Sequence, residues 1–189
     1  MNKQTFLIFI GVILIGVFVL GNGKFLAPLP SVVHSPIVDL EDGDVFDLTA
    51  GYVTKEIGGK KQTMLAYNGS IPGPTIRIAQ GAEITINFKN STDLPALLHS
   101  HGVRMDNMFD GSQTVQKEME PGESFSYTLT FPDAGVYWYH PHAAEVYGQG
   151  LGLYGAFVVM PSNPDYFPPV NREIPLFLSD IPIENGTIT

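Results

Sequence analysis

Two short histidine motifs carry the clearest chemical signal in the sequence. Four of the five histidines form the pairs His99–His101 and His140–His142, and His34 stands apart. In an extended strand, residues i and i+2 project from the same face, so each pair can direct two imidazoles at one point. Imidazole suits copper, zinc, iron and nickel, whereas calcium and magnesium prefer oxygen ligands. A single pair can be an ordinary hydrogen-bonded motif, but two pairs on neighbouring strands predict a transition-metal site.

The composition limits which metal chemistry and which partners are possible. The chain has 189 residues and no cysteine, so it has neither disulfides nor the thiolate that a blue-copper electron-transfer site requires. Any copper must therefore sit among imidazoles. The net charge is −9 and no basic run occurs, which argues against a nucleic-acid partner.

The elements that must position the histidines read as strands. Apolar and polar residues alternate with a period of two over residues 45–50, 84–88 and 124–131. Segment 96–101 carries the first histidine pair, and segment 136–140 delivers the second pair at its end. The many glycines and prolines mark turns between strands, and the turn at Gly58-Gly59 predicts a hairpin. No stretch after the N-terminal segment has a helical period. This pattern predicts an all-β, antiparallel sandwich or barrel.

The N-terminal segment has a different character. Lys3 precedes an unbroken apolar run from Phe6 to Leu20. Such a run predicts a hydrophobic helix within residues 1–23 that serves as a membrane anchor or a signal segment. We expect an exported protein, anchored with its domain outside the cytoplasm, or secreted or periplasmic after cleavage. Residues 24–43, with His34 as a solvated residue, read as a linker.

The C-terminal segment predicts a second structural unit. Residues 163–189 begin as a proline-containing linker, and Glu173–Ser179 has the pattern of a strand. We expect this strand to begin a second domain that is missing from the chain. The alternative is an edge strand that returns to the first sheet.

Several motifs, in their order along the chain, resemble one family. They are Ile71-Pro72-Gly73-Pro74-Thr75-Ile76, His99-Ser100-His101-Gly102, Asp110-Gly111, the segment 116–124, Tyr137-Trp138-Tyr139-His140-Pro141-His142 and the closing segment 148–159. Together they resemble the N-terminal cupredoxin (plastocyanin-like) domain of laccase-like multicopper oxidases. The resemblance implies a cupredoxin-like Greek-key β-sandwich or barrel over residues 44–162.

The resemblance also implies roles for individual residues. The four histidines would supply half of the ligands of a trinuclear copper cluster that reduces O2 to water while oxidising a one-electron donor. His99 would bind the type 2 copper, His101 and His140 one type 3 copper, and His142 the other. Asp110 would assist proton delivery to oxygen from the outer sphere, and the alternative is a plain Asp-Gly turn in a loop.

Two departures from the family pattern limit this expectation. The family usually has Trp where this chain has Ser100, a position that should face away from the metal. The remaining histidine motifs and the cysteine-containing site of the family are absent, and a missing C-terminal cupredoxin domain would have to supply them. Reduction of O2 takes four electrons that enter through a thiolate site, so we expect the chain alone to be inactive.

Other functions stay open at this stage. The chain can be a stand-alone copper-binding module for buffering or delivery, or an interaction domain whose histidines are vestigial. A nitrite reductase-like arrangement is disfavoured because its first domain normally carries a cysteine site. The membrane, O2 and a small reducing substrate or metal ion are the expected partners. Copper binding needs neutral imidazoles and should weaken as the pH falls through about 6.5.

Overall fold

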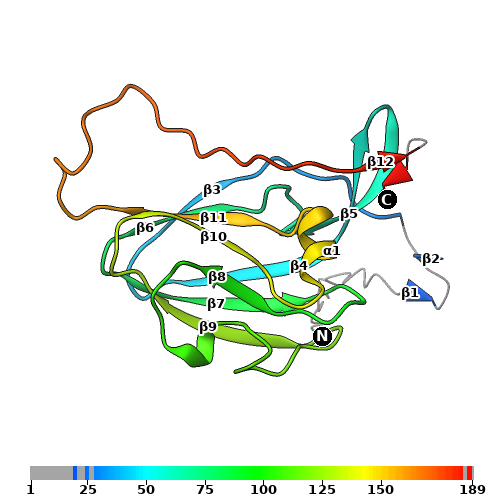
Figure 1. Ribbon diagram of the computed structural model, residues 1–189, viewed down its shortest axis with the longest axis horizontal. Coiled ribbons are helices and arrows are strands. Elements are labelled where there is room, and N and C mark those ends of the chain that lie inside the picture. Colours follow the sequence, from blue (N-terminus) through cyan, green and yellow to red (C-terminus); the bar gives the residue numbers. More distant parts are fainter. Residues whose placement is uncertain (1–18, 21–23, 26–27, 185–186, 189) are drawn as a thin grey trace, which may run out of the picture.

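Two β-sheets packed face to face form the body of the protein (Figure 1). The computed structural model describes residues 19–20, 24–25, 28–184 and 187–188. The five-stranded sheet has the order β3 (Ile37–Leu40), β6 (Thr75–Ala79), β11 (Gly155–Met160), β10 (Gly135–Pro141), β8 (Leu98–His101). The four-stranded sheet has the order β5 (Lys60–Tyr67), β4 (Val45–Ile57), β7 (Glu83–Asn90), β9 (Ser124–Thr130). The predicted all-β sandwich is thereby confirmed.

The sheets are mixed, and the expectation of purely antiparallel pairing was wrong. Strand β6 pairs in parallel with both β3 and β11, and β4 pairs in parallel with β7. Alternation along a strand reveals which face is buried but carries no information on the direction of its neighbour. Strands β4 and β5 form the hairpin that the glycine turn at 58–59 predicts.

The core lies between the sheets and follows the period-two pattern of the strands. Ile84, Ile86 and Phe88 of β7 are at most 1% exposed, and they belong to the same buried cluster as Phe157 of the five-stranded sheet. Burial of each such side chain contributes about 1.5–3 kcal/mol. This packing fixes the distance between the two sheets, and it thereby holds the five-stranded sheet, which contains β8 and β10, in position.

Tyr139 ties β10, the strand of the second histidine pair, into this core. Its side chain is fully buried, contacts Tyr67 and donates a hydrogen bond of 2.6 Å to the carbonyl oxygen of Pro74. Gly155 lies opposite Tyr139 in β11, where a Cβ atom would come within 2.1 Å of the Tyr139 ring. Glycine at 155 therefore makes room for the ring that holds β10 in place.

The N-terminal predictions have a mixed outcome. The predicted helix within residues 1–23 lies outside the described residues, except for Val19–Leu20, which form strand β1 and pair with β2 (Lys24–Phe25). Within the described part of the chain, no helix has the length and apolar character needed to cross a membrane. Strand β3 lies in the region expected to be a linker and joins the sheet beside β6.

The C-terminal segment differs from its predicted form. Residues 173–179 do not form a strand; the segment crosses the molecule without sheet partners and ends near the β4–β5 hairpin (Figure 1). Pro175 lacks a backbone N–H and cannot donate a hydrogen bond to a neighbouring strand, which disfavours strand pairing in this segment. Among the described residues that follow, β12 (Ile183–Glu184) pairs with β13 (Thr187–Ile188).

One helix was missed at the sequence level. Helix α1 (Glu145–Gly150) follows the second histidine pair, where no helical period was found, and it precedes strand β11. A helix of six residues is too short to establish an apolar repeat. A 3-10 turn, η1 (Asn107–Phe109), lies in the loop after the first pair.

Candidate metal centre

The pairing of β8 with β10 brings the two histidine motifs together. The strands run antiparallel, and their register places His99 opposite His140 and His101 opposite Trp138. Ser100 lies opposite Tyr139 and is 2% exposed, on the face that points into the core. The expectation that Ser100 faces away from the histidines is therefore confirmed, as strand alternation requires.

All four imidazoles converge at the end of this strand pair. The ring centroids of His99 lie 5.4 Å from His101, 5.2 Å from His140 and 4.2 Å from His142. One candidate ligand nitrogen from each of His99, His140 and His142 lies within 4.8 Å of the other two. His101 adjoins this group, because its Nδ1 is 3.4 Å from Nε2 of His140.

His99 is oriented by the backbone of the loop that follows β8. Its Nδ1 lies 2.6 Å from the carbonyl oxygen of Asp110, so an Nδ1–H can donate there and leave Nε2 available to a metal. The carboxylate of Asp110 is farther away, with Oδ1 at 3.6 Å from the same nitrogen. Asp110 thus lies beside the cluster, as the family motif implied, but its closest contact with His99 is made by its main-chain carbonyl oxygen and not by its carboxylate.

Gly111 permits this loop to approach β8. Its φ is +69°, and a Cβ atom there would come within 1.9 Å of the carbonyl oxygen of Leu98. Only glycine combines this conformation with so close a contact. The Asp110-Gly111 motif consequently fixes the ring of His99 from behind.

His140 is the most enclosed of the four histidines. It is 1% exposed, and its Nδ1 lies 3.0 Å from the carbonyl oxygen of Pro141 and 2.8 Å from the side-chain amide of Gln149. Burial lowers the pKa of His140 to about 4, although the Pro141 carbonyl acts in the opposite direction. A histidine that stays neutral is ready to bind a metal without first losing a proton.

Trp138 and Gln149 were missed as site residues at the sequence level. Trp138 stacks on His140 with ring centroids 3.9 Å apart and 24° between the planes. Its position two residues before His140 on the same strand was a usable signal. Gln149 lies on α1, and its contact with His140 arises from a helix that left no trace in the sequence pattern.

The donor set fits copper. It consists of imidazole nitrogens from four residues, two of which already have a partner for the other ring nitrogen, and it includes no thiolate. Neutral imidazole is a good ligand for copper and zinc, and a hydrogen-bonded second nitrogen increases its basicity and fixes its orientation. The fifth histidine, His34, is exposed and lies before β3, outside this group.

Comparison with known proteins gives one consistent result. The family model for multicopper oxidases matches residues 49–164. Copper resistance protein A of Pseudomonas syringae pv. tomato is 30% identical over 148 residues, which are 78% of this chain and 24% of that protein. The protein of the same name from Escherichia coli is 32% identical over 82% of this chain and 25% of its own length. This chain thus spans about a quarter of the length of these relatives.

Solved structures agree with the sequence relatives. The crystal structure of a multicopper oxidase from Pseudomonas thermotolerans superposes with a TM-score of 0.62 at 34% identity, covering 68% of this chain and 31% of that one. A multicopper oxidase of Campylobacter jejuni, described as a metallo-oxidase, gives a TM-score of 0.61 at 29% identity over 72% of this chain and 31% of its own.

Proposed function

Since this chain belongs to the multicopper oxidase family, we propose that it binds copper between β8 and β10 and supplies four ligands to a trinuclear copper cluster. The observation that carries the proposal is the convergence of His99, His140 and His142, with ligand nitrogens mutually within 4.8 Å. His101 at 3.4 Å from His140 adds the fourth ligand. Bound copper supplies the one-electron redox chemistry through which O2 is reduced.

The division of ligands among three ions follows the family pattern. We assign His99 to a type 2 ion, His101 and His140 to one type 3 ion, and His142 to the other. The short approach between His101 and His140 supports their sharing an ion. The tightest group of three, however, contains His142 in place of His101, so ring adjustments would accompany metal binding.

Asp110 is the residue best placed to handle protons. Its carboxylate is 36% exposed and lies 3.6 Å from Nδ1 of His99, so it reaches both solvent and the edge of the cluster. A carboxyl group in this position can take up a proton from water and present it beside the histidines. The buried His140 stays neutral and acts as a ligand and not as a proton donor.

The complete reaction requires more protein than the four histidines provide. The relatives are about four times as long as the matched region, and this chain contains no cysteine to admit electrons. We propose that a C-terminal cupredoxin domain supplies the remaining ligands and the electron entry site. O2 and a small reducing substrate or metal ion are the proposed reactants, and the apolar run at 6–20 supports export to a compartment outside the cytoplasm.

A second candidate is a copper-binding module that stores or delivers the metal without catalysis. The absence of cysteine favours it, because four imidazoles bind copper without completing an electron path. The two candidate functions differ in what happens to the bound copper. In the first, the copper takes part in O2 reduction; in the second, it is transferred to an acceptor.

Copper loading and two subsequent assays test these proposals. Electron paramagnetic resonance of the Cu²⁺-loaded chain should show nitrogen coordination from histidine. The loaded chain alone should consume O2 with a reductant no faster than free copper, and a longer protein containing it should consume O2 catalytically. Fast copper transfer to an apo-acceptor, with no O2 turnover in the longer protein, would support the module instead. A spectrum of the Cu²⁺-loaded chain without nitrogen coordination from histidine would exclude both candidate functions.

A further inference from the structure

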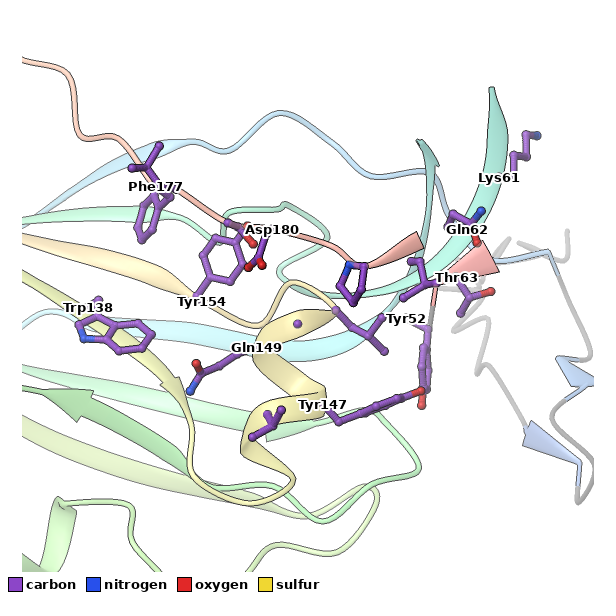
Figure 2. Close-up of a pocket in the computed structure, with 17 residues that line it drawn as sticks. Tyr52, Lys61, Gln62, Thr63, Trp138, Tyr147, Gln149, Tyr154, Phe177 and Asp180 are labelled. Carbon is purple, nitrogen blue, oxygen red and sulfur yellow. The ribbon is translucent and has the colours of Figure 1, made fainter. Parts of the chain in front are cut away.

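The side chain of Gln149 connects helix α1 to the buried histidine of the cluster. Its amide nitrogen Nε2 lies 2.8 Å from Nδ1 of His140 and 3.1 Å from Oε1 of Glu145, four residues earlier on the same helix. The side chain extends from α1 toward the strand that carries Trp138 (Figure 2). One amide group therefore contacts a carboxylate and a candidate metal ligand at the same time.

Glu145 determines which end of this amide faces His140. A carboxylate accepts hydrogen bonds and cannot donate them, and residues four apart on a helix are neighbours, so Glu145 draws the –NH2 group of Gln149 toward itself. That group has two N–H bonds, one for Glu145 and one for Nδ1 of His140. An Nδ1 atom that accepts a hydrogen bond carries no proton of its own.

The contact with Gln149 therefore bears on where the proton of His140 lies. A neutral imidazole carries one proton, on either Nδ1 or Nε2. The Gln149 amide favours the form with the proton on Nε2, the atom that lies 3.4 Å from Nδ1 of His101. The main-chain carbonyl oxygen of Pro141, 3.0 Å from Nδ1 of His140, favours the opposite form. The two contacts compete, and only the form that Pro141 favours leaves the lone pair of Nε2 free for a metal.

The ring of His140 cannot turn over to resolve this competition. It is 1% exposed and stacks on Trp138 with centroids 3.9 Å apart. Turning it over would also place carbon atoms where the two nitrogen atoms now lie, and the contacts with Gln149 and Pro141 would be lost. The Gln149 amide, in contrast, lies in the wall of a cavity of about 1090 Å³ between α1, β10 and the C-terminal segment, where it has room to rotate (Figure 2).

We propose that Gln149, oriented by Glu145, is a positioning residue that holds His140 with its proton on Nε2 and thereby opposes metal binding through that atom. This inference rests on the proposed copper function of the cluster. Copper binding through Nε2 requires that proton to leave and another to join Nδ1, where it is donated to Pro141, so the ring neither gains nor loses a proton overall. The Gln149 amide then has to turn its oxygen toward the ring.

Nuclear magnetic resonance of the metal-free 189-residue chain at neutral pH tests the proton position directly. Long-range ¹H–¹⁵N correlations distinguish a proton on Nδ1 from one on Nε2, and the spectrum of His140→Leu identifies the signals of His140. We expect the Nε2 form in the parent chain. Gln149→Met preserves the length of the side chain but removes the amide, so His140 should change to the Nδ1 form. Glu145→Ala should have the same effect, because it allows the Gln149 amide to present its oxygen to the ring.

Gln113→Met is the matched control. Gln113 also donates its amide to a glutamate, Glu118, but this exposed pair lies in the loop between η1 and β9. The control should leave the proton position of His140 unchanged. Titration with Cu²⁺ against a chromogenic chelator gives a second readout. Gln149→Met should bind Cu²⁺ about fivefold more tightly than the parent, which corresponds to one neutral hydrogen bond, whereas the loss of a merely structural contact would weaken binding.

The Nδ1 form in the parent chain, or the same form in the parent and in both variants of the amide pair, would overturn the inference. Weaker Cu²⁺ binding by Gln149→Met would do so as well. The outcome is separate from that of the metal site. If neither the parent nor the variants bind copper, a change of proton position still supports the role of Gln149 and contradicts the metal site. An unchanged proton position with normal copper binding has the reverse meaning.

Discussion

The Nδ1 atom of His99 lies 2.6 Å from the main-chain carbonyl oxygen of Asp110 and 3.6 Å from its carboxylate. The backbone of the loop therefore orients His99, and the side chain of Asp110 is left for another purpose. Orientation of His99 by the main chain of Asp110 is therefore separate from any role of the Asp110 carboxylate in proton delivery. It also means that the two roles can be tested by substitution at one position.

Asp110→Asn should leave copper binding within about twofold of the parent, because the carbonyl contact to His99 is retained. In a longer, O2-reducing form of the protein, the same change should slow turnover by about 10²-fold, the usual contribution of a positioned proton donor. Equilibrium dialysis with metal analysis and O2 uptake measure the two effects. Copper loss equal to that of His99→Ala would show that the carboxylate is needed for the metal site.

Gly111→Ala should destabilise the fold much more than an equivalent change elsewhere. Both Gly111 (φ +69°) and Gly43 (φ +86°) have left-handed backbone conformations, but only at Gly111 would an added Cβ atom meet a neighbouring atom within 4 Å. We expect a loss of about 1–2 kcal/mol in the free energy of unfolding for Gly43→Ala and at least about 3 kcal/mol for Gly111→Ala. Urea unfolding measures both, and equal losses would refute the close packing of the loop on β8.

Tyr139→Phe should cost about 1–3 kcal/mol, because it leaves the buried carbonyl oxygen of Pro74 without its 2.6 Å hydrogen bond. Tyr137→Phe is the matched control. It also removes a tyrosine hydroxyl bonded to a main-chain carbonyl, that of Asp133 at 3.1 Å, but this bond is exposed. Its cost should stay below about 0.5 kcal/mol. The prediction fails if the two variants unfold at the same urea concentration.

His140 should make the stability of the metal-free chain depend on pH. Its pKa is about 4 in the folded chain because the ring is buried, and about 6.5 when unfolded. The unfolded chain then binds a proton that the folded chain does not, so stability is complete above pH 6.5 and falls progressively toward pH 4. We expect a loss of about 3 kcal/mol from this group. His140→Leu should lack that component, and parallel pH profiles for the two proteins would contradict the burial of a neutral ring.

The histidine cluster was predictable because it depends on local geometry. Alternation along a strand placed His99 with His101 and His140 with His142, and one strand pairing then completed the group. Asp110 was found through the motif it shares with Gly111. The buried face of β7 and the hairpin of β4 with β5 likewise followed from period and turn residues alone.

Features that depend on tertiary contacts were not predictable. The sequence of β3 was interpreted as part of a linker, because a segment of four residues is too short to show a strand pattern. It forms a strand through its pairing with β6. The contact of Gln149 with His140 required α1, which is too short to show a helical repeat. The segment 173–179 had the pattern of a strand, but it has no strand partner, and Phe177 packs against Tyr154 instead. In each of these cases, tertiary contacts and not the local sequence pattern determined the conformation of the segment.

Copper stoichiometry of the histidine variants tests the metal site most directly. The parent chain should retain Cu²⁺ after equilibrium dialysis, and the double variant His101→Ala/His140→Ala should retain none while keeping its β-sheet circular dichroism. His34→Ala should bind copper as the parent does, since His34 lies outside the cluster. Unchanged copper content in the folded double variant, or loss of copper in His34→Ala, would contradict the assignment of the metal to β8 and β10.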